Sequence, residues 1–155
     1  MPIFTPSNTQ TMDKAVKPAL YAVRSDKELR DLRDVSVLVY MDHNSIDAGY
    51  LKAIKKLTRF TDEIIATWLH ISPRTMRSYK SEKVLDKKLS EQVVMLRTVF
   101  EKGKAVLGDA GAFDKWLDTP NYFFDGKKPI NFLDTTSGMR YLFDRLTAME
   151  YGDNV

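Results

Sequence analysis

The amino-acid sequence predicts a mainly α-helical fold, and three stretches of helical periodicity support that prediction. Two short helices with cap signals occupy residues 61–81, a long apolar stripe covers residues 93–107, and a last amphipathic helix covers residues 139–149. We expect three parts: an N-terminal extension, partly disordered, over residues 1–45, a helix-turn-helix module over residues 46–88, and a long helix with a small helical domain and a short extended aromatic segment over residues 89–155.

Composition limits the chemistry that the chain can perform. It has 155 residues, enough for one domain or two small ones, and no cysteine, so disulfides and cysteine-ligated metals are excluded. His43 and His70 are its only histidines, so we do not expect a histidine-based metal site. The N-terminus lacks a signal pattern, and the longest apolar run, Val35–Met41, is too short to span a bilayer. We expect a cytoplasmic protein with no metal and no cofactor.

The positive charge is concentrated in the middle of the chain. Residues 50–104 contain 13 Lys/Arg against 6 Asp/Glu, whereas residues 1–49 contain 6 against 7 and residues 105–155 contain 5 against 8. A lysine-rich stretch is usually a solvated face. Here the basic excess coincides with the predicted helix-turn-helix, which favours contact with nucleic-acid phosphates.

The N-terminal extension gives weak signals. Residues 1–19 are rich in Thr, Ser, Asn, Gln and Pro, and we expect them to be disordered or loosely packed. Ser25 is placed to cap a short helix over Asp26–Asp34. The run 35–40 is compatible with a strand or a helix, because periodicity cannot decide so short a segment. Asp42-His43-Asn44 is expected to be a turn, with a structural or exposed histidine.

The central pair of helices has strong boundary signals. Thr61 is a good N-cap, and Asp62 and Glu63 suit the first turn of the helix dipole. Ser72-Pro73 restarts a helix, because serine caps and proline fits the first helical position. The first helix should bury one face, formed by Ile64, Ile65, Trp68 and Leu69.

The second helix has a basic outer face over residues 73–81, and its apolar residues are Met76 and Tyr79. Ala66 is small enough for the two helices to cross there. His70 stands where a left-handed residue, usually glycine, is expected. An ordinary helical hairpin is the alternative, but the pattern resembles the helix-turn-helix of Xre-type repressors.

The flanking segments complete the predicted architecture. A helix over Tyr50–Leu57 precedes the pair, a basic connector covers residues 81–88, and Ser90-Glu91 opens the long helix. Residues 112–117 form a short helix that ends at Thr119-Pro120. The later signals are an extended aromatic segment over 121–124, a turn at Asp125-Gly126, a helical turn from Pro129, a cap at Thr136 and a C-cap glycine, Gly152.

The C-terminal half carries a second resemblance. The series Trp116-Leu117, Pro120-Asn121, Phe124, Gly126, Pro129, Leu133, Thr135, Gly138, Leu142, Leu146 and Glu150-Tyr151-Gly152 is similar to the C-terminal toxin-binding domain of the MbcA/ParS/Xre antitoxins. With the helix-turn-helix, the resemblance covers about residues 46–152. It implies an antitoxin that binds a RES-domain toxin, which attacks NAD or transfers ADP-ribose from it, and that represses its own operon.

The resemblance and the charge pattern together give two sets of candidate residues. We expect operator DNA to contact Ser72, Arg74, Thr75, Arg77, Ser78, Lys80 and Ser81, with Lys55 and Lys87 on phosphates. The resemblance implies a toxin-binding set formed by Trp116, Asn121, Tyr122, Phe123, Phe124, Pro129, Leu133 and an occluding tail, Tyr151, Gly152, Asp153, Asn154 and Val155.

A single helix-turn-helix makes few base contacts, so a homodimer is expected, and a higher hetero-oligomer with the toxin. The stripe over 93–107 is broad enough to contact both halves of the protein or a second copy of it. This stripe and the aromatic C-terminal half are the surfaces that the sequence offers for dimerisation. A one-component repressor without a toxin partner is the alternative function. An enzyme is not expected, because the sequence has no nucleophile motif, no cofactor loop and no clustered catalytic residues.

Overall fold

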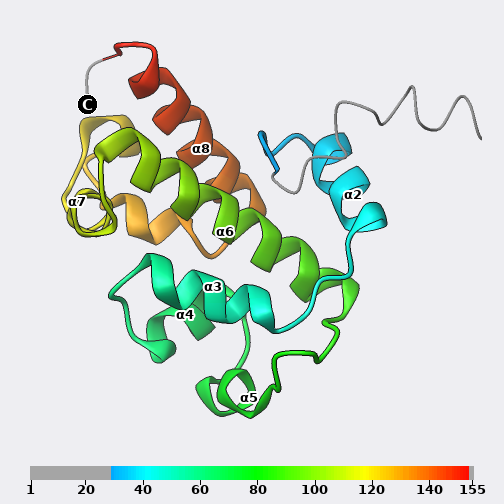
Figure 1. Cartoon of the computed structure of the whole chain (residues 1–155). Coiled ribbons are helices and arrows are strands. Elements are labelled where there is room, and N and C mark those ends of the chain that lie inside the picture. Colours follow the sequence, from blue (N-terminus) through cyan, green and yellow to red (C-terminus); the bar gives the residue numbers. More distant parts are fainter. Residues whose placement is uncertain (1–28, 154–155) are drawn as a thin grey trace, which may run out of the picture.

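The protein is mainly helical, as the computed structural model shows for the residues it describes, 29–153 (Figure 1). Within that range there is no strand, only one isolated antiparallel bridge between Asp47 and Val84. The helices are α2 (Asp34–His43), α3 (Gly49–Leu57), α4 (Asp62–Trp68), α5 (Pro73–Ser78), α6 (Lys87–Leu107), α7 (Ala110–Leu117), η2 (Tyr122–Phe124), η3 (Pro129–Phe132) and α8 (Thr136–Glu150).

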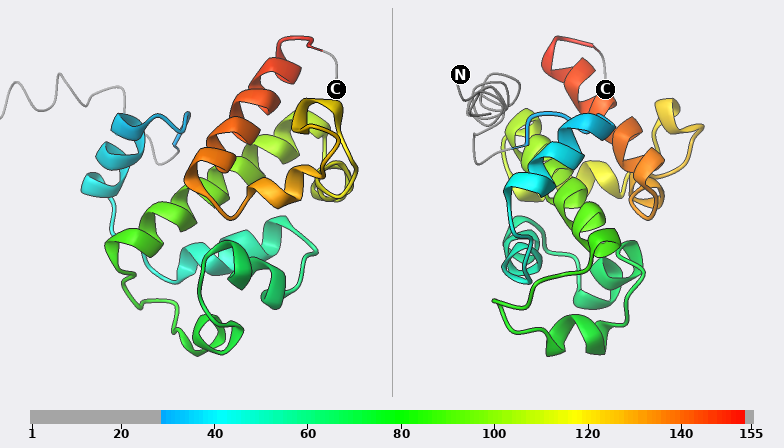
Figure 2. Two further views of the ribbon diagram at one scale, coloured as in Figure 1. Left: turned by 180° about the vertical axis from the view of Figure 1, so that it is seen from behind. Right: turned by 90° about the vertical axis from the view of Figure 1, so that its right-hand side faces the viewer.

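The long helix α6 forms the centre of the molecule. The helix-turn-helix elements α3–α5 lie on one side of it and α7 and α8 on the other (Figures 1 and 2). Its core residues, which include Val93, Leu96, Val99 and Phe100, are fully buried against α3, α7 and α8 of the same chain. The stripe over 93–107 therefore contacts both halves of the same chain, as one of the two alternatives expects, and most of it is not available as a dimerisation surface.

The long helix begins earlier than the sequence indicated. Asp86 is the N-cap, and its carboxylate accepts a hydrogen bond from the Leu89 N–H (3.0 Å), so α6 opens at Lys87 rather than at Ser90-Glu91. Ser90 is buried, and its hydroxyl donates to the Leu85 carbonyl (3.1 Å). Aspartate is as good an N-cap as serine. The helix therefore begins after Asp86, the first of the two candidate caps along the chain, and not at Ser90.

The segment before the helix-turn-helix differs from the expectation in two places. Residues 29–33 are not helical, so the predicted helix over Asp26–Asp34 is wrong where it is described, and its first part, like residues 1–19, lies outside the described residues. The ambiguous run 35–40 is helical, within α2. His43 is the last residue of α2, so the predicted turn begins only at Asn44.

The C-terminal half is built on short helices and aromatic packing. Only Asn121 of the predicted extended segment is extended, whereas residues 122–124 form the 3₁₀ helix η2, because the Asn121 side chain accepts a hydrogen bond from the Phe123 N–H (2.9 Å). The predicted turn at Asp125-Gly126 and the helical turn from Pro129 are confirmed. Thr135, not Thr136, caps α8 by accepting from the Gly138 N–H (3.0 Å).

One close approach fixes η3 against α8. A Cβ atom built at Gly138 would lie 2.0 Å from the carbonyl oxygen of Phe132, so only glycine fits at that position. This contact positions the segment between η3 and α8, which carries Asp134. No helix within residues 29–153 is long and apolar enough to cross a membrane.

Candidate nucleic-acid interface and toxin-binding surface

The two helices of the predicted helix-turn-helix are capped as the sequence indicated. Thr61 accepts from the Ile64 N–H (3.5 Å) at the start of α4, and Ser72 accepts from the Thr75 N–H (2.9 Å) at the start of α5. Ala66 is fully buried, and Met76 packs in the same core. Ile64 is exposed, so the predicted apolar face of α4 is narrower than expected. The small core therefore sets the crossing of α4 and α5.

The turn between the helices depends on a left-handed histidine. His70 has φ 55°, as expected at this position. The Ile71 N–H donates to the Ala66 carbonyl (3.1 Å) and the His70 N–H to the Thr67 carbonyl (3.2 Å), the hydrogen-bond pattern of a Schellman motif. The ring Nε2 of His70 also bonds the backbone carbonyl of Asp134 (2.6 Å), just before α8. The helix-turn-helix is thus attached to the C-terminal half at its turn.

The recognition helix is shorter than predicted. It ends at Ser78, and Tyr79 has an extended backbone, so Lys80 and Ser81 follow the helix instead of belonging to its outer face. The chain then runs back beside the segment before α3, where the Ala48 N–H donates to Lys83 (2.9 Å) and the Gly49 N–H to Ser81 (3.0 Å). This backbone pairing presents Lys80 as part of a loop beside α5.

The basic side chains of this face are not equivalent. Arg77 reaches back to Asp62 (3.6 Å) and Glu63 (3.2 Å), and Lys55 pairs with Asp62 (3.0 Å). The Glu63 backbone N–H, Arg77 and Thr61 together hold the pKa of Glu63 below its ordinary value. Arg74 is exposed and has no ion pair within the described residues. Arg74 is therefore the α5 arginine whose charge is available to a ligand.

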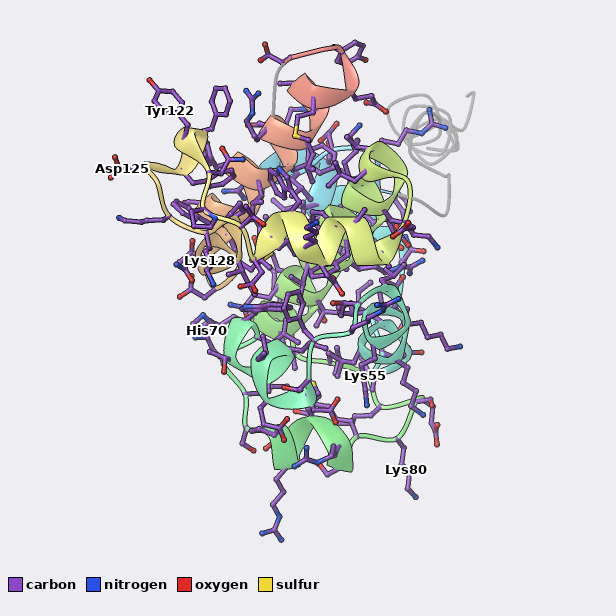
Figure 3. The ribbon with its side chains drawn as sticks, turned by 90° about the vertical axis from the view of Figure 1, so that its left-hand side faces the viewer. Lys55, His70, Lys80, Tyr122, Asp125 and Lys128 are labelled. Atoms are coloured by element: carbon purple, nitrogen blue, oxygen red, sulfur yellow. The ribbon has the colours of Figure 1, made fainter. Side chains whose placement is uncertain are left out.

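The other residues predicted to contact DNA include some that are hydrogen-bonded within the chain and some that are exposed. Ser72 and Thr75 bond each other through their hydroxyls (2.7 Å), and the Ser78 hydroxyl donates to the Thr75 carbonyl (2.7 Å). Lys80 extends from the loop toward solvent (Figure 3). Lys87 is exposed on the first turn of α6, where it lines a groove beside α2.

Among the predicted toxin-binding residues that the structure describes, four are buried, Asn121 and Phe123 are half-buried, and the others are exposed. Trp116, Phe124, Pro129 and Leu133 are buried in the core of the C-terminal half. Tyr122 is 90% exposed on η2, and Tyr151 is 84% exposed at the end of α8. The four buried residues shape the domain in the free chain, and the two tyrosines are the large side chains that a partner can reach.

A half-buried arginine that the sequence did not single out, Arg145, packs on the neighbour of Tyr122. The guanidinium of Arg145 stacks over the Phe123 ring (3.5 Å from its centroid) and pairs with Asp153 (3.2 Å). Its side chain is only 9% exposed. Arg145 follows Tyr141 by four residues on α8, and the Tyr141 hydroxyl donates to the Phe123 carbonyl. This helical spacing was visible in the sequence, but its aromatic partner was not.

The tail turns back at the predicted C-cap glycine. Gly152 has φ 93°, its N–H donates to Met149 (3.1 Å), and the Asp153 N–H donates to Ala148 (3.0 Å), which is a second Schellman motif. The glycine C-cap prediction is confirmed. The chain does not leave α8 in an extended direction up to Asp153, because Asp153 pairs with Arg145. Asn154 and Val155 lie outside the described residues.

The two candidate surfaces lie far apart on the molecule. Tyr122 projects at one end and Lys80 at the other, with His70 and Lys128 between them (Figure 3). The described residues contain no cluster of three or more His, Cys, Asp or Glu side chains that could hold a metal ion.

Two protein-family models match the parts of the chain that carry these surfaces. The family model of the antitoxin Xre-like helix-turn-helix domain matches residues 37–97, and that of the antitoxin Xre/MbcA/ParS C-terminal toxin-binding domain matches residues 102–152. The chain belongs to the Xre/MbcA/ParS-type antitoxins. A search of curated proteins found no match.

The family gives each half of the antitoxin a role. The N-terminal part is an Xre-like helix-turn-helix domain and the C-terminal part a toxin-binding domain, so the protein is the antitoxin of a toxin–antitoxin pair. Neither domain family is generally enzymatic. The boundary between the two matched regions falls inside α6. One continuous helix therefore links the DNA-binding and toxin-binding parts.

Proposed function

We propose that this antitoxin acts in the cytoplasm, neutralises a RES-class toxin that consumes NAD or transfers ADP-ribose, and represses its own operon. Operator DNA would contact the helix-turn-helix of two antitoxin copies, and the toxin would dock on the C-terminal half to form a hetero-oligomer. The separation of the two surfaces supports this division of labour, because one can be occupied while the other stays accessible.

The exposed charge of Arg74 carries the DNA-binding proposal. It lies near the start of α5, where a recognition helix approaches the base edges of the major groove. Arg77 is held by two carboxylates of α4, and its release requires those contacts to break. Lys55, beside Asp62, and Lys80, on the following loop, are placed to meet phosphates.

Arg74→Ala is expected to weaken operator binding by about 1–3 kcal/mol if the side chain reads a base. Arg77→Ala should cost less, because its charge is already shared with Asp62 and Glu63. Lys80→Ala should lower the slope of log affinity against log salt by about one. Fluorescence anisotropy on a promoter fragment measures all three. Wild-type binding by the double Arg74/Arg77 alanine variant would mean that α5 is not the recognition helix.

Two exposed tyrosines carry the toxin-binding proposal. Tyr122 and Tyr151 are large side chains that expose 90% and 84% of their surface, and tyrosine and arginine are the residues that most often anchor protein interfaces. The Tyr122 ring packs edge-on against the Phe123 ring, whose stack with Arg145 holds η2 against α8, and Tyr151 follows the last residue of α8. We propose that this surface docks first and brings the tail to the toxin.

The tail is proposed to silence the toxin as an anion. A pocket that binds NAD must accommodate its pyrophosphate, and a carboxylate can occupy such a position through charge-assisted hydrogen bonds. Asp153 supplies a carboxylate of that kind. In the free chain Arg145 holds Asp153, so the pocket must compete with this ion pair for the same carboxylate.

Deletion of Gly152–Val155 is expected to restore NAD loss while the toxin complex stays assembled. Because this deletion also removes the cap of α8, deletion of Asn154 and Val155 alone is the matched variant that keeps the Schellman motif. Co-purification with the toxin from the adjacent reading frame and an NAD consumption assay separate binding from inhibition. If both truncated proteins inhibit fully, the tail is not the inhibitor, and inhibition must come from the docking surface or from assembly.

A further inference from the structure

A single side chain connects the two parts of the chain that are proposed to meet the toxin. The guanidinium of Arg145, on α8, lies 3.5 Å from the centroid of the Phe123 ring and 3.2 Å from a carboxylate oxygen of Asp153. Phe123 belongs to η2 and follows Tyr122, whereas Asp153 belongs to the tail after α8. Arg145 therefore contacts an element of the proposed docking surface and the proposed occluding tail at the same time.

The two members of the ion pair differ in their freedom to move. The Arg145 side chain is 9% exposed, whereas the Asp153 side chain is 63% exposed. A cation with so little water around it depends on neighbouring carboxylates and aromatic faces for its stabilisation. Asp153 can turn into solvent, but Arg145 is enclosed by its neighbours. The carboxylate is thus the movable member of this pair.

The backbone around Phe123 is fixed, and its ring adjoins the exposed Tyr122. The Phe123 N–H donates to the Asn121 side chain (2.9 Å). Its carbonyl accepts from the hydroxyl of Tyr141, which lies on α8 one turn before Arg145. The Tyr122 ring packs edge-on against the Phe123 ring, with 5.7 Å between the centroids, and Tyr122 is 90% exposed. A protein that docks on Tyr122 therefore presses on the ring that holds Arg145.

We propose that Arg145 is a latch, which holds the tail against α8 in the free antitoxin and releases it when a toxin docks on η2. Contact at Tyr122 shifts the Phe123 ring relative to the guanidinium, the pair with Asp153 opens, and the carboxylate becomes available to the toxin. Docking and occlusion then follow in sequence. The inference rests on the proposed tail occlusion and adds the residue that regulates it.

The latch has a measurable consequence for inhibition. A segment that binds only after its release has an affinity reduced by the fraction of molecules in which it is released. Arg145 therefore lowers the inhibitory strength of the tail, although it lies in the toxin-binding half. Loss of Arg145 should make the full chain a stronger inhibitor, which is the opposite of what the loss of a toxin contact produces.

Hydrogen exchange of the free, full-length chain tests the latch without toxin. Arg145→Gln should raise the exchange rate of the Asp153 amide about two- to tenfold, while the amides of α6 keep their rates. Phe123→Leu removes the ring but keeps both members of the ion pair, so its effect should be smaller. Arg140→Gln is the matched control, because Arg140 is also on α8 but pairs with Asp34. It should leave exchange at Asp153 unchanged.

Inhibition of NAD loss is then measured with four chains, the wild type and Arg145→Gln, each with and without Gly152–Val155. Arg145→Gln should tighten inhibition about two- to tenfold in the full chain and should give no such gain in the truncated chain. A residue that only supports the fold would weaken inhibition in both. Arg145→Lys keeps the charge that pairs with Asp153, so it should fall between the wild type and Arg145→Gln.

The outcomes separate the latch from the tail occlusion on which it rests. Unchanged exchange at Asp153 in Arg145→Gln overturns the latch. Where tail deletion weakens wild-type inhibition, a gain from Arg145→Gln in the full chain alone supports the latch, and equal effects in full and truncated chains overturn it. If exchange becomes faster while full and truncated wild-type chains inhibit equally, Arg145 holds the tail, and the proposed occlusion fails instead.

Discussion

The turn after α4 and the turn after α8 have the same backbone design with different residues at the critical position. Both are Schellman motifs, with His70 at φ 55° in the first and Gly152 at φ 93° in the second. Glycine adopts this conformation without steric cost, whereas a side chain costs about 1–2 kcal/mol there. The first turn therefore needs a compensating contact, and the His70–Asp134 hydrogen bond provides one.

The two turns differ in how firmly they are attached to the rest of the protein. The turn of the helix-turn-helix is fastened to the segment before α8, so the recognition helix is held by the toxin-binding half. The turn at the end of α8 is exposed, and the Arg145–Asp153 ion pair attaches it to the helix. The first arrangement gives a fixed geometry, and the second gives a tail that a partner can take over.

The largest loss of stability is expected from a substitution at Gly138, which lies next to the segment that anchors the first turn. A Cβ there would collide with the Phe132 carbonyl, so Gly138→Ala must displace the segment that carries Asp134. Overpacking of this kind costs about 1–3 kcal/mol, although alanine gains up to about 1 kcal/mol of helix propensity. Thermal unfolding should show a lower melting temperature, with exposed Ser137→Ala as the control. A melting temperature equal to that of the control would show that η3 is free to move.

The next largest loss of stability is expected from removal of the His70–Asp134 hydrogen bond. His70→Ala keeps the left-handed backbone and loses the bond to Asp134, which should destabilise the protein by about 1–2 kcal/mol. His70→Gly loses the same bond but also the steric cost, so its free energy of unfolding should stay within about 0.5 kcal/mol of the wild type. Chemical denaturation compares the pair. Equal losses in both variants would mean that the turn carries no strain.

A smaller effect is expected at the end of α8. Gly152→Ala meets no neighbouring atom, so its cost is conformational alone, about 1 kcal/mol, and is confined to the last turn. Hydrogen exchange of the Asp153 amide should become faster while α6 amides do not change. Gly152→Asn should have a weaker effect, since asparagine tolerates this conformation better. Unchanged exchange at Asp153 would exclude the glycine cap as the element that turns the tail.

The smallest effect is expected on operator affinity. Glu63→Gln removes a negative charge next to the proposed DNA face and releases one contact of Arg77. Both changes favour phosphate binding, so the affinity should rise about two- to fivefold at low salt and less at high salt. Asp153→Asn, at the far end of the chain, is the control. A lower affinity would show that the carboxylate orients Arg77 for DNA.

Local signals explain which parts of the fold could be predicted from the sequence. The caps Thr61 and Ser72, the left-handed His70 and the C-cap Gly152 depend on residues within one turn of each other, and the structure confirms them. Two wrong predictions also have local causes. Asp86 preceded Ser90 as a cap, and the Asn121 side chain turned an aromatic segment into a 3₁₀ helix.

Contacts between distant residues could not be predicted in this way. The Arg145–Phe123 stack and the His70–Asp134 bond join residues 22 and 64 positions apart, and no periodicity relates them. The same limit applies to burial. The stripe over 93–107 satisfied the pattern of an interface, but α3, α7 and α8 of the same chain cover it. Within the candidate toxin-binding set, the structure separates the exposed Tyr122 and Tyr151 from the half-buried Phe123.

The central claim is that one chain carries two independent binding surfaces, and a crossed assay of two variants tests it most directly. Arg74→Ala and the double variant Tyr122→Ala/Tyr151→Ala are each measured for operator affinity and for inhibition of NAD loss by the toxin. We expect Arg74→Ala to lose operator binding and inhibit fully, and the tyrosine variant to bind operator normally and release toxin activity. Loss of both functions in either variant, or of neither in both, would contradict the account.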